Sequence, residues 1–187
     1  MKAVDNIMIK YISLEDVDTN SEYYYYVQDL INEEPVVQMK QYLQHGTTTT
    51  FEHCLNVSYY NYLICKKFGL DARAGARAGL LHDLFLYDWH YYPIKKFDRL
   101  RHGATHPRLA CANACKYFVL SDREQDIIKK HMFPMTITPP KYKETMVIIL
   151  VDKYCGLVET LGSRIMAIKN VLYNKKHKKT TYDIVQK

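Results

Sequence analysis

The chain has 187 residues, of which 48% are hydrophobic and 25% charged, as is usual for a globular protein of one domain. The five cysteines form no CxxC pair, and the sequence starts without an apolar leader. The longest apolar run covers only residues 146–151, which is too short to cross a membrane. These features argue against a secreted or membrane-spanning protein. The net charge of +6 lies partly in Lys175, Lys176, Lys178 and Lys179, and it fits an anionic substrate, nucleic acid or solubility alone. We expect a soluble, cytoplasmic protein.

The pattern of caps and breakers predicts helices along most of the chain, because glycine and proline are scarce and no segment alternates strictly between apolar and polar residues. Capping residues start several of them: Ser21, Asp71, and Ser121 with Glu124 as a capping box. Predicted helices cover about residues 21–32, 35–45, 47–68, 71–84, 107–120, 121–131, 142–161 and 163–176. We expect Pro107 in the first turn of its helix and an irregular, aromatic-rich connection over residues 85–105.

A histidine on the predicted helix 47–68 belongs to its apolar face. His53 is followed at helical spacing by Val57, Tyr60 and Ile64, so its imidazole points inward. Taken alone, such a histidine is more often a hydrogen-bonded core residue than a metal ligand. It becomes informative only together with the acidic residues below.

Two further positions place charge next to apolar sequence. His82 and Asp83 end an apolar run, and Asp152 follows the apolar residues 146–151. An ionised carboxylate buried in such surroundings needs a partner, because an unpaired buried charge is expensive. For Asp83 the alternative is a solvent-exposed helix end, and for Asp152 it is a structural ion pair. Metal ligation is the third interpretation for both.

The order histidine, histidine–aspartate, aspartate on three separate predicted helices resembles the HD-domain superfamily of metal-dependent phosphohydrolases. The sequences GLLHDL at 79–84 and VDK at 151–153 fit this resemblance, which covers about residues 50–160. It implies an all-α bundle of about seven to eight helices. The core would be residues 47–162 of one domain spanning 1–187, with helices 21–45 and 163–176 appended. It also implies that His53, His82, Asp83 and Asp152 bind metal.

Two more histidines extend the resemblance to dinuclear members of the superfamily, in which a second pair lies between the His-Asp pair and the last aspartate. His106, followed by proline as in bacterial diadenosine tetraphosphate hydrolases, and His131 take these positions. The glycine-rich stretch of those enzymes is replaced here by residues 132–134, which leaves the substrate open. His102 competes with His106, since both lie in or near the predicted connection, and we favour His106.

The resemblance implies a cofactor of one or two divalent transition-metal ions, because imidazole and carboxylate ligands suit such metals. We favour iron or manganese, with zinc, cobalt or nickel as alternatives. Asp83 would bridge two ions, and a water molecule bound to the metal would lose a proton and attack phosphorus. Lys153 and Asp88 are further candidates for catalysis. Candidates for binding the substrate are Arg77, Arg101, His102 and Lys153.

The function expected from these residues is hydrolysis of a phosphoester or phosphoanhydride in a small phosphorylated substrate, with a nucleotide favoured. A di-iron oxygenase of the HD-domain type is the runner-up, because a similar ligand set also activates oxygen. A non-catalytic nucleotide-binding or partner-binding module is the third interpretation. We expect no membrane partner and rank nucleic acid last, because no predicted helix carries a clean basic stripe.

Overall fold

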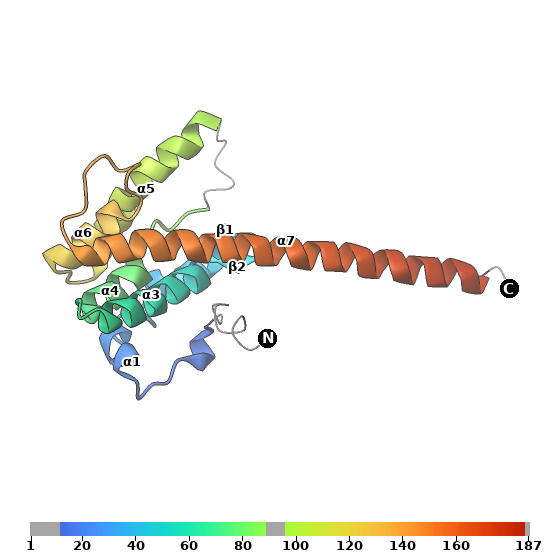
Figure 1. The fold of residues 1–187 in the computed structure, drawn as a ribbon, viewed down its shortest axis with the longest axis horizontal. Coiled ribbons are helices and arrows are strands. Elements are labelled where there is room, and N and C mark those ends of the chain that lie inside the picture. Colours follow the sequence, from blue (N-terminus) through green and yellow to red (C-terminus); the bar gives the residue numbers. More distant parts are fainter. Residues whose placement is uncertain (1–11, 89–95, 186–187) are drawn as a thin grey trace.

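The computed structural model describes residues 12–88 and 96–185, with side chains described outside 96–102 and 168–185. Within these ranges the chain is mainly α-helical, so the all-α prediction is confirmed (Figure 1). The elements are, in order, a 3₁₀ turn (Leu14–Asp16), α1 (Glu22–Val27), α2 (Glu34–Val37), a 3₁₀ turn (Gln38–Gln41), β1 (Leu43–His45), β2 (Thr48–Thr49), α3 (Thr50–Lys67), α4 (Ala72–Leu81), α5 (Lys96–Tyr117), α6 (Asp122–Lys130) and α7 (Lys143–Val185).

Helices α3 and α4 form the centre of the fold and pack side by side, with α7 crossing them (Figure 1). Apolar side chains from all seven α-helices of the described residues meet in the core, including Leu55, Leu80, Ile127 and Ile148. The contact between α3 and α4 is close because α4 carries a glycine where it passes α3. A Cβ atom at Gly79 would stand 2.6 Å from a backbone carbon of α3, so no larger residue fits without a shift.

The predicted helix starts are confirmed by the hydrogen bonds of their caps. The hydroxyl of Ser21 accepts from the backbone amide of Tyr24, and the carboxylate of Asp71 accepts from that of Ala74. Ser121 and Glu124 form the expected capping box. These side chains satisfy amides that have no partner inside their helices, and this is why such short motifs mark helix starts reliably.

The predicted helix over residues 35–45 is wrong. The chain makes one short turn of α2 and a 3₁₀ turn, and then forms the antiparallel hairpin β1–β2. Gly46, expected to end a helix, lies in the hairpin turn with φ of +61°. A Cβ atom there would also stand 2.2 Å from the Ser163 hydroxyl, so the glycine lets the hairpin approach α7.

Two predicted breaks lie inside continuous helices. Pro107 was expected in a first turn, yet α5 begins at Lys96, so the second half of the expected 85–105 connection is helical. Residues 89–95 of that connection lie outside the described residues. Gly162 was expected to separate two helices, but α7 runs through it for 43 residues and extends past the rest of the fold (Figure 1). None of the described helices has the length and apolar character that crossing a membrane requires.

Candidate metal centre

Five elements bring the six predicted ligands to one place inside the fold. His53 lies on α3, His106 on α5 and Asp152 on α7, while His131 forms the C-cap of α6. His82 and Asp83 directly follow α4. All are buried except Asp152, whose side chain is 13% exposed.

Asp152 gathers two of the histidines into one half of the cluster. Its Oδ1 atom lies 3.1 Å from His53 Nε2 and 3.6 Å from His82 Nε2. Asp83 joins this half through Oδ2, which lies 3.5 Å from His82 Nε2. Two ring nitrogens and two carboxylate oxygens therefore converge, and this is a donor set that suits a divalent transition metal.

The other carboxylate oxygen of Asp83 faces the remaining two histidines. Asp83 Oδ1 lies 3.2 Å from His106 Nε2 and 3.6 Å from His131 Nε2, and the two ring nitrogens are 2.9 Å apart. Asp83 thus stands between the two halves, with one oxygen directed to each. A carboxylate in this position can bridge two metal ions.

Hydrogen bonds to the far side of the rings orient three of the histidines. His82 Nδ1 donates to the carbonyl of Gly79, and His131 Nδ1 donates to the carbonyl of Ile128, both at 2.8 Å. A carbonyl can only accept, so a proton lies on Nδ1 and Nε2 is the nitrogen directed to the centre. His53 Nδ1 is bound in the same way, at 2.9 Å from Glu159 Oε2.

The donor set fits a bound cation because two of its atoms lack a partner. His82 Nε2 and Asp83 Oδ1 are fully buried and make no hydrogen bond with the described residues. A buried polar atom without a partner is costly and calls for an explanation. Coordination of a metal ion by these two atoms would satisfy both.

The electrostatics of the cluster keep His131 and Asp152 in the protonation states that metal binding requires. Burial, together with the neighbouring His82 and His106, lowers the pKa of His131 to about 3 and keeps its ring neutral. Burial alone would raise the pKa of Asp152, but the hydrogen bond from His53 and the nearby His82 ring hold it well below its usual value.

His53 and His82 are exceptions, because both favour the positively charged form. Burial opposes the charge of His82, but Asp83, Cys54 and Asp152 hold its pKa well above its usual value. Burial also works against the charge of His53, but hydrogen bonds to Asp152 and Glu159 prevail and raise the pKa of His53 to about 10. Binding of a metal ion at Nε2 would release that proton.

Three residues beside the cluster were not predicted from the sequence. The Gln44 side-chain amide donates to Asp83 Oδ2, and Glu159 binds His53. His45 packs edge-on against the His53 ring, with ring centres 5.2 Å apart. Glu159 carried a usable signal, since it follows Asp152 by seven residues and so lies on the same face of α7. Gln44 and His45 carried none, because the hairpin that positions them was not predicted.

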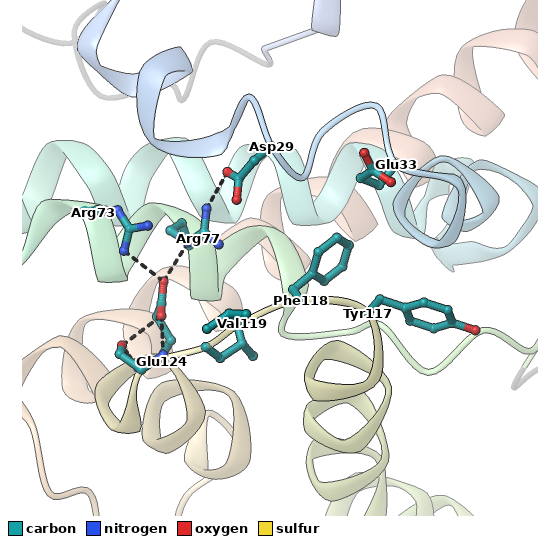
Figure 2. A pocket seen from close by; sticks show the side chains of 10 residues that line it. Asp29, Glu33, Arg73, Arg77, Tyr117, Phe118, Val119 and Glu124 are labelled. Carbon is teal, nitrogen blue, oxygen red and sulfur yellow. Dashed lines mark hydrogen bonds and ion pairs between the residues drawn. The ribbon is translucent and has the colours of Figure 1, made fainter.

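Arg77, predicted to bind substrate, is placed elsewhere. It lies in a separate pocket, where its guanidinium is paired with Glu124 at 2.7 Å and with Asp29 at 2.5 Å (Figure 2). The guanidinium is 3% exposed, so these carboxylates occupy it and the expected phosphate contact is not supported. The sequence-based prediction did not allow for burial of Arg77. A buried arginine needs carboxylate partners within the protein, and these take the place of a substrate phosphate.

The remaining predicted site residues lie on α5, on α7 and in the segment after α4. Lys153 is exposed, and its ammonium donates to the Ile149 carbonyl at 3.3 Å. Asp88 is half-buried in the segment after α4. Arg101 and His102 belong to α5 rather than to a loop, and their side chains lie outside the described ones.

The sequence was compared with known protein families. The family described as HD domain matches residues 50–157, which is more than half of the chain and includes all six clustered residues. Neither a curated protein nor a solved structure matches the chain.

Proposed function

The chain belongs to the HD-domain family, and on that premise we propose that it hydrolyses a phosphoester or phosphoanhydride of a small phosphorylated substrate with the help of bound divalent metal. Members of this family are generally metal-dependent phosphohydrolases. A nucleotide is the substrate class we favour. The proposed metal ligands are His53, His82, Asp83, His106, His131 and Asp152.

The observation that carries this proposal is the placement of Asp83. Its two oxygens face two separate groups of ring nitrogens, and the one that faces His106 and His131 makes no hydrogen bond. This arrangement supports a site for about two ions, with Asp83 shared between them. Iron or manganese is favoured from the mixed nitrogen and oxygen donors.

A divalent ion in this cluster would act as a Lewis acid toward phosphoryl oxygens and would lower the pKa of a water molecule. The residues of the chain supply the rest. Carbonyl and carboxylate acceptors at Nδ1 orient the rings of His82, His131 and His53 so that Nε2 is directed to the centre. Gln44 holds Asp83 from the side by donating to Oδ2, which limits rotation of that carboxylate.

Access of substrate is proposed from the side of Asp152, because it alone among the ligands is partly exposed. Lys153 lies next to it and is proposed to contact phosphate, which requires its ammonium to leave the Ile149 carbonyl. Asp88 remains a proposed helper in positioning water or a ligand.

The test is metal-dependent phosphate release. Protein loaded with Mn²⁺ or Fe²⁺ would be incubated with nucleoside phosphates, a dinucleoside polyphosphate and p-nitrophenyl phosphate. His82→Ala should abolish turnover. The matched control is Glu144→Gln, which changes a buried carboxylate on α7 whose partner is Arg123 rather than a clustered residue.

Two outcomes would contradict the proposal. Iron-dependent oxygen consumption without phosphate release would indicate the oxygenase chemistry that similar ligand sets support. Binding of nucleotide without turnover, by protein that carries its metal, would indicate a binding module.

A further inference from the structure

A hollow of about 410 Å³ lies between α5, α6 and the loop that follows α6. Its walls include Arg108 of α5, Lys129 and Lys130 of α6, and Met135, Thr136 and Ile137 of the loop. This volume is in the range of sites that hold small molecules. None of the six predicted metal ligands lines the hollow, so it is separate from the metal cluster.

The hollow carries positive charge that the protein does not neutralise. Arg108 is exposed and makes no ion pair with any described residue. Lys129 donates to the uncharged side-chain amide oxygen of Gln125 at 3.1 Å, so its charge is also uncompensated. Only Lys130 has a carboxylate partner, Asp126, and no carboxylate lines the hollow itself. Such a surface attracts an anion.

The loop adds a hydroxyl and an apolar wall. The Thr136 hydroxyl oxygen is buried and makes no hydrogen bond with the described residues, so rotation of this side chain toward the hollow would give the hydroxyl a partner in a ligand oxygen. Ile137 is 92% exposed and Met135 is 39% exposed, which is unusual for large apolar side chains beside a pocket. They offer a surface to the uncharged part of a ligand.

The larger pocket of Figure 2, of about 690 Å³, does not have this excess of positive charge. Its buried arginine, Arg77, is held by Glu124 and Asp29, and Arg73 lies 3.8 Å from the same Glu124. With Glu33 also in the wall, its carboxylates outnumber its cations. An anion would meet repulsion there, so size alone does not select the binding site.

We propose that the hollow between α5 and α6 binds the phosphate group of a small phosphorylated ligand. Arg108 and Lys129 bind the phosphate oxygens, Thr136 donates a further hydrogen bond, and Met135 with Ile137 contacts the apolar part. The ligand is either the substrate, through a phosphate away from the reacting one, or a separate phosphorylated effector. The assignment to the substrate rests on the proposed function, whereas phosphate binding itself does not.

The hollow and the metal cluster are built in part from the same two helices, α5 and α6. Helix α5 carries both Arg108 and His106, and Lys130 directly precedes His131. The loop after α6 also packs closely against α5, because a Cβ atom at Gly103 would stand 2.4 Å from the Met135 side chain. A ligand held here therefore contacts the two helices that position His106 and His131.

The experiment is a calorimetric titration of full-length protein at low salt with a chelator present, using inorganic pyrophosphate and then ADP as probes. Arg108→Ala should weaken binding of both probes by about tenfold or more, because a charge-assisted contact is lost. Lys116→Ala is the matched control, since it removes a charge from the exposed surface of α5 outside the hollow and should bind as wild type.

Equal affinities in wild type, Arg108→Ala and Lys116→Ala would overturn the proposal, as would binding that disappears when metal is chelated. Kinetics on metal-loaded protein then separate the two ligand sources. A raised KM in Arg108→Ala with little change in kcat identifies the substrate phosphate. An unchanged KM, with loss of any response to added ADP, identifies an effector. If the loaded protein hydrolyses no phosphoester at all, the proposed function fails while probe binding under chelator still stands.

Discussion

Replacement of Glu159 by glutamine should weaken metal binding without removing any proposed ligand. The Glu159 carboxylate is 1% exposed and lies 2.9 Å from His53 Nδ1. It fixes the ring so that Nε2 faces Asp152. Glutamine keeps the size and an acceptor oxygen but loses the charge, and its amide can also turn a donor toward the ring.

The expected loss follows from the role of such outer carboxylates. Removing a partner that orients a metal-binding histidine typically lowers metal affinity by about 10–100-fold, which corresponds to about 1.4–2.7 kcal/mol. We expect the lower half of this range, because the amide oxygen of glutamine can still accept from His53 Nδ1.

The assay is competition for Mn²⁺ or Zn²⁺ against a chelator of known affinity, at fixed pH. Glu144→Gln is the control, because Glu144 is a buried carboxylate on the same helix that pairs with Arg123 at 3.0 Å. It should lower thermal stability and leave metal affinity unchanged. Wild-type metal affinity in Glu159→Gln would refute the positioning role of this carboxylate.

Three further predictions concern packing, the interior ion pair and metal stoichiometry. Gly79→Ala should destabilise the fold by about 1–3 kcal/mol, because the added methyl group overpacks against α3. Gly162→Ala has open space at its Cβ and should stabilise α7 by up to about 1 kcal/mol. Thermal melting of the two variants measures both changes. Arg77→Ala should cost about 3–5 kcal/mol in denaturant unfolding, because the buried Glu124 loses its main counter-charge and keeps only Arg73, at 3.8 Å, and metal content should not change. His131→Ala should reduce bound metal from about two ions to about one by elemental analysis, with the helical circular dichroism signal retained.

The helix starts and the face of His53 could be predicted because both depend on local chemistry. Caps such as Asp71 act within three residues, and helical spacing alone places His53 with Val57 on the inner side of α3. Distant residues are brought together by the fold, so their convergence could be inferred only from the family resemblance.

The errors arose where tertiary packing outweighs local preference. A proline inside a helix costs about 3 kcal/mol and a glycine about 1 kcal/mol. In α5, the cost of Pro107 is offset by the burial of Ala110, Cys111 and Ala114 on one face of the helix. The glycine at 162 is too weak a breaker to end α7. A short hairpin such as β1–β2, set by a single glycine turn, leaves almost no periodic signal.

Arg77 shows the limit of choosing substrate residues by their position near a motif. It precedes His82 by five residues, yet on a helix this separation turns its side chain to a different face. The structure places it between Glu124 and Asp29 instead. The cationic residues of the α5–α6 hollow were not selected from the sequence, because Arg108 and Lys129 come together only through the packing of two helices.

The most direct test of the central claim is the metal content of the purified chain, measured by elemental analysis after preparation without chelator or nickel resin. About two iron or manganese ions per chain are predicted for the wild type, with substantial loss in Asp83→Asn, because Asp83 faces both halves of the cluster. A chain without metal that also takes up no manganese, iron, zinc, cobalt or nickel on addition would contradict the account.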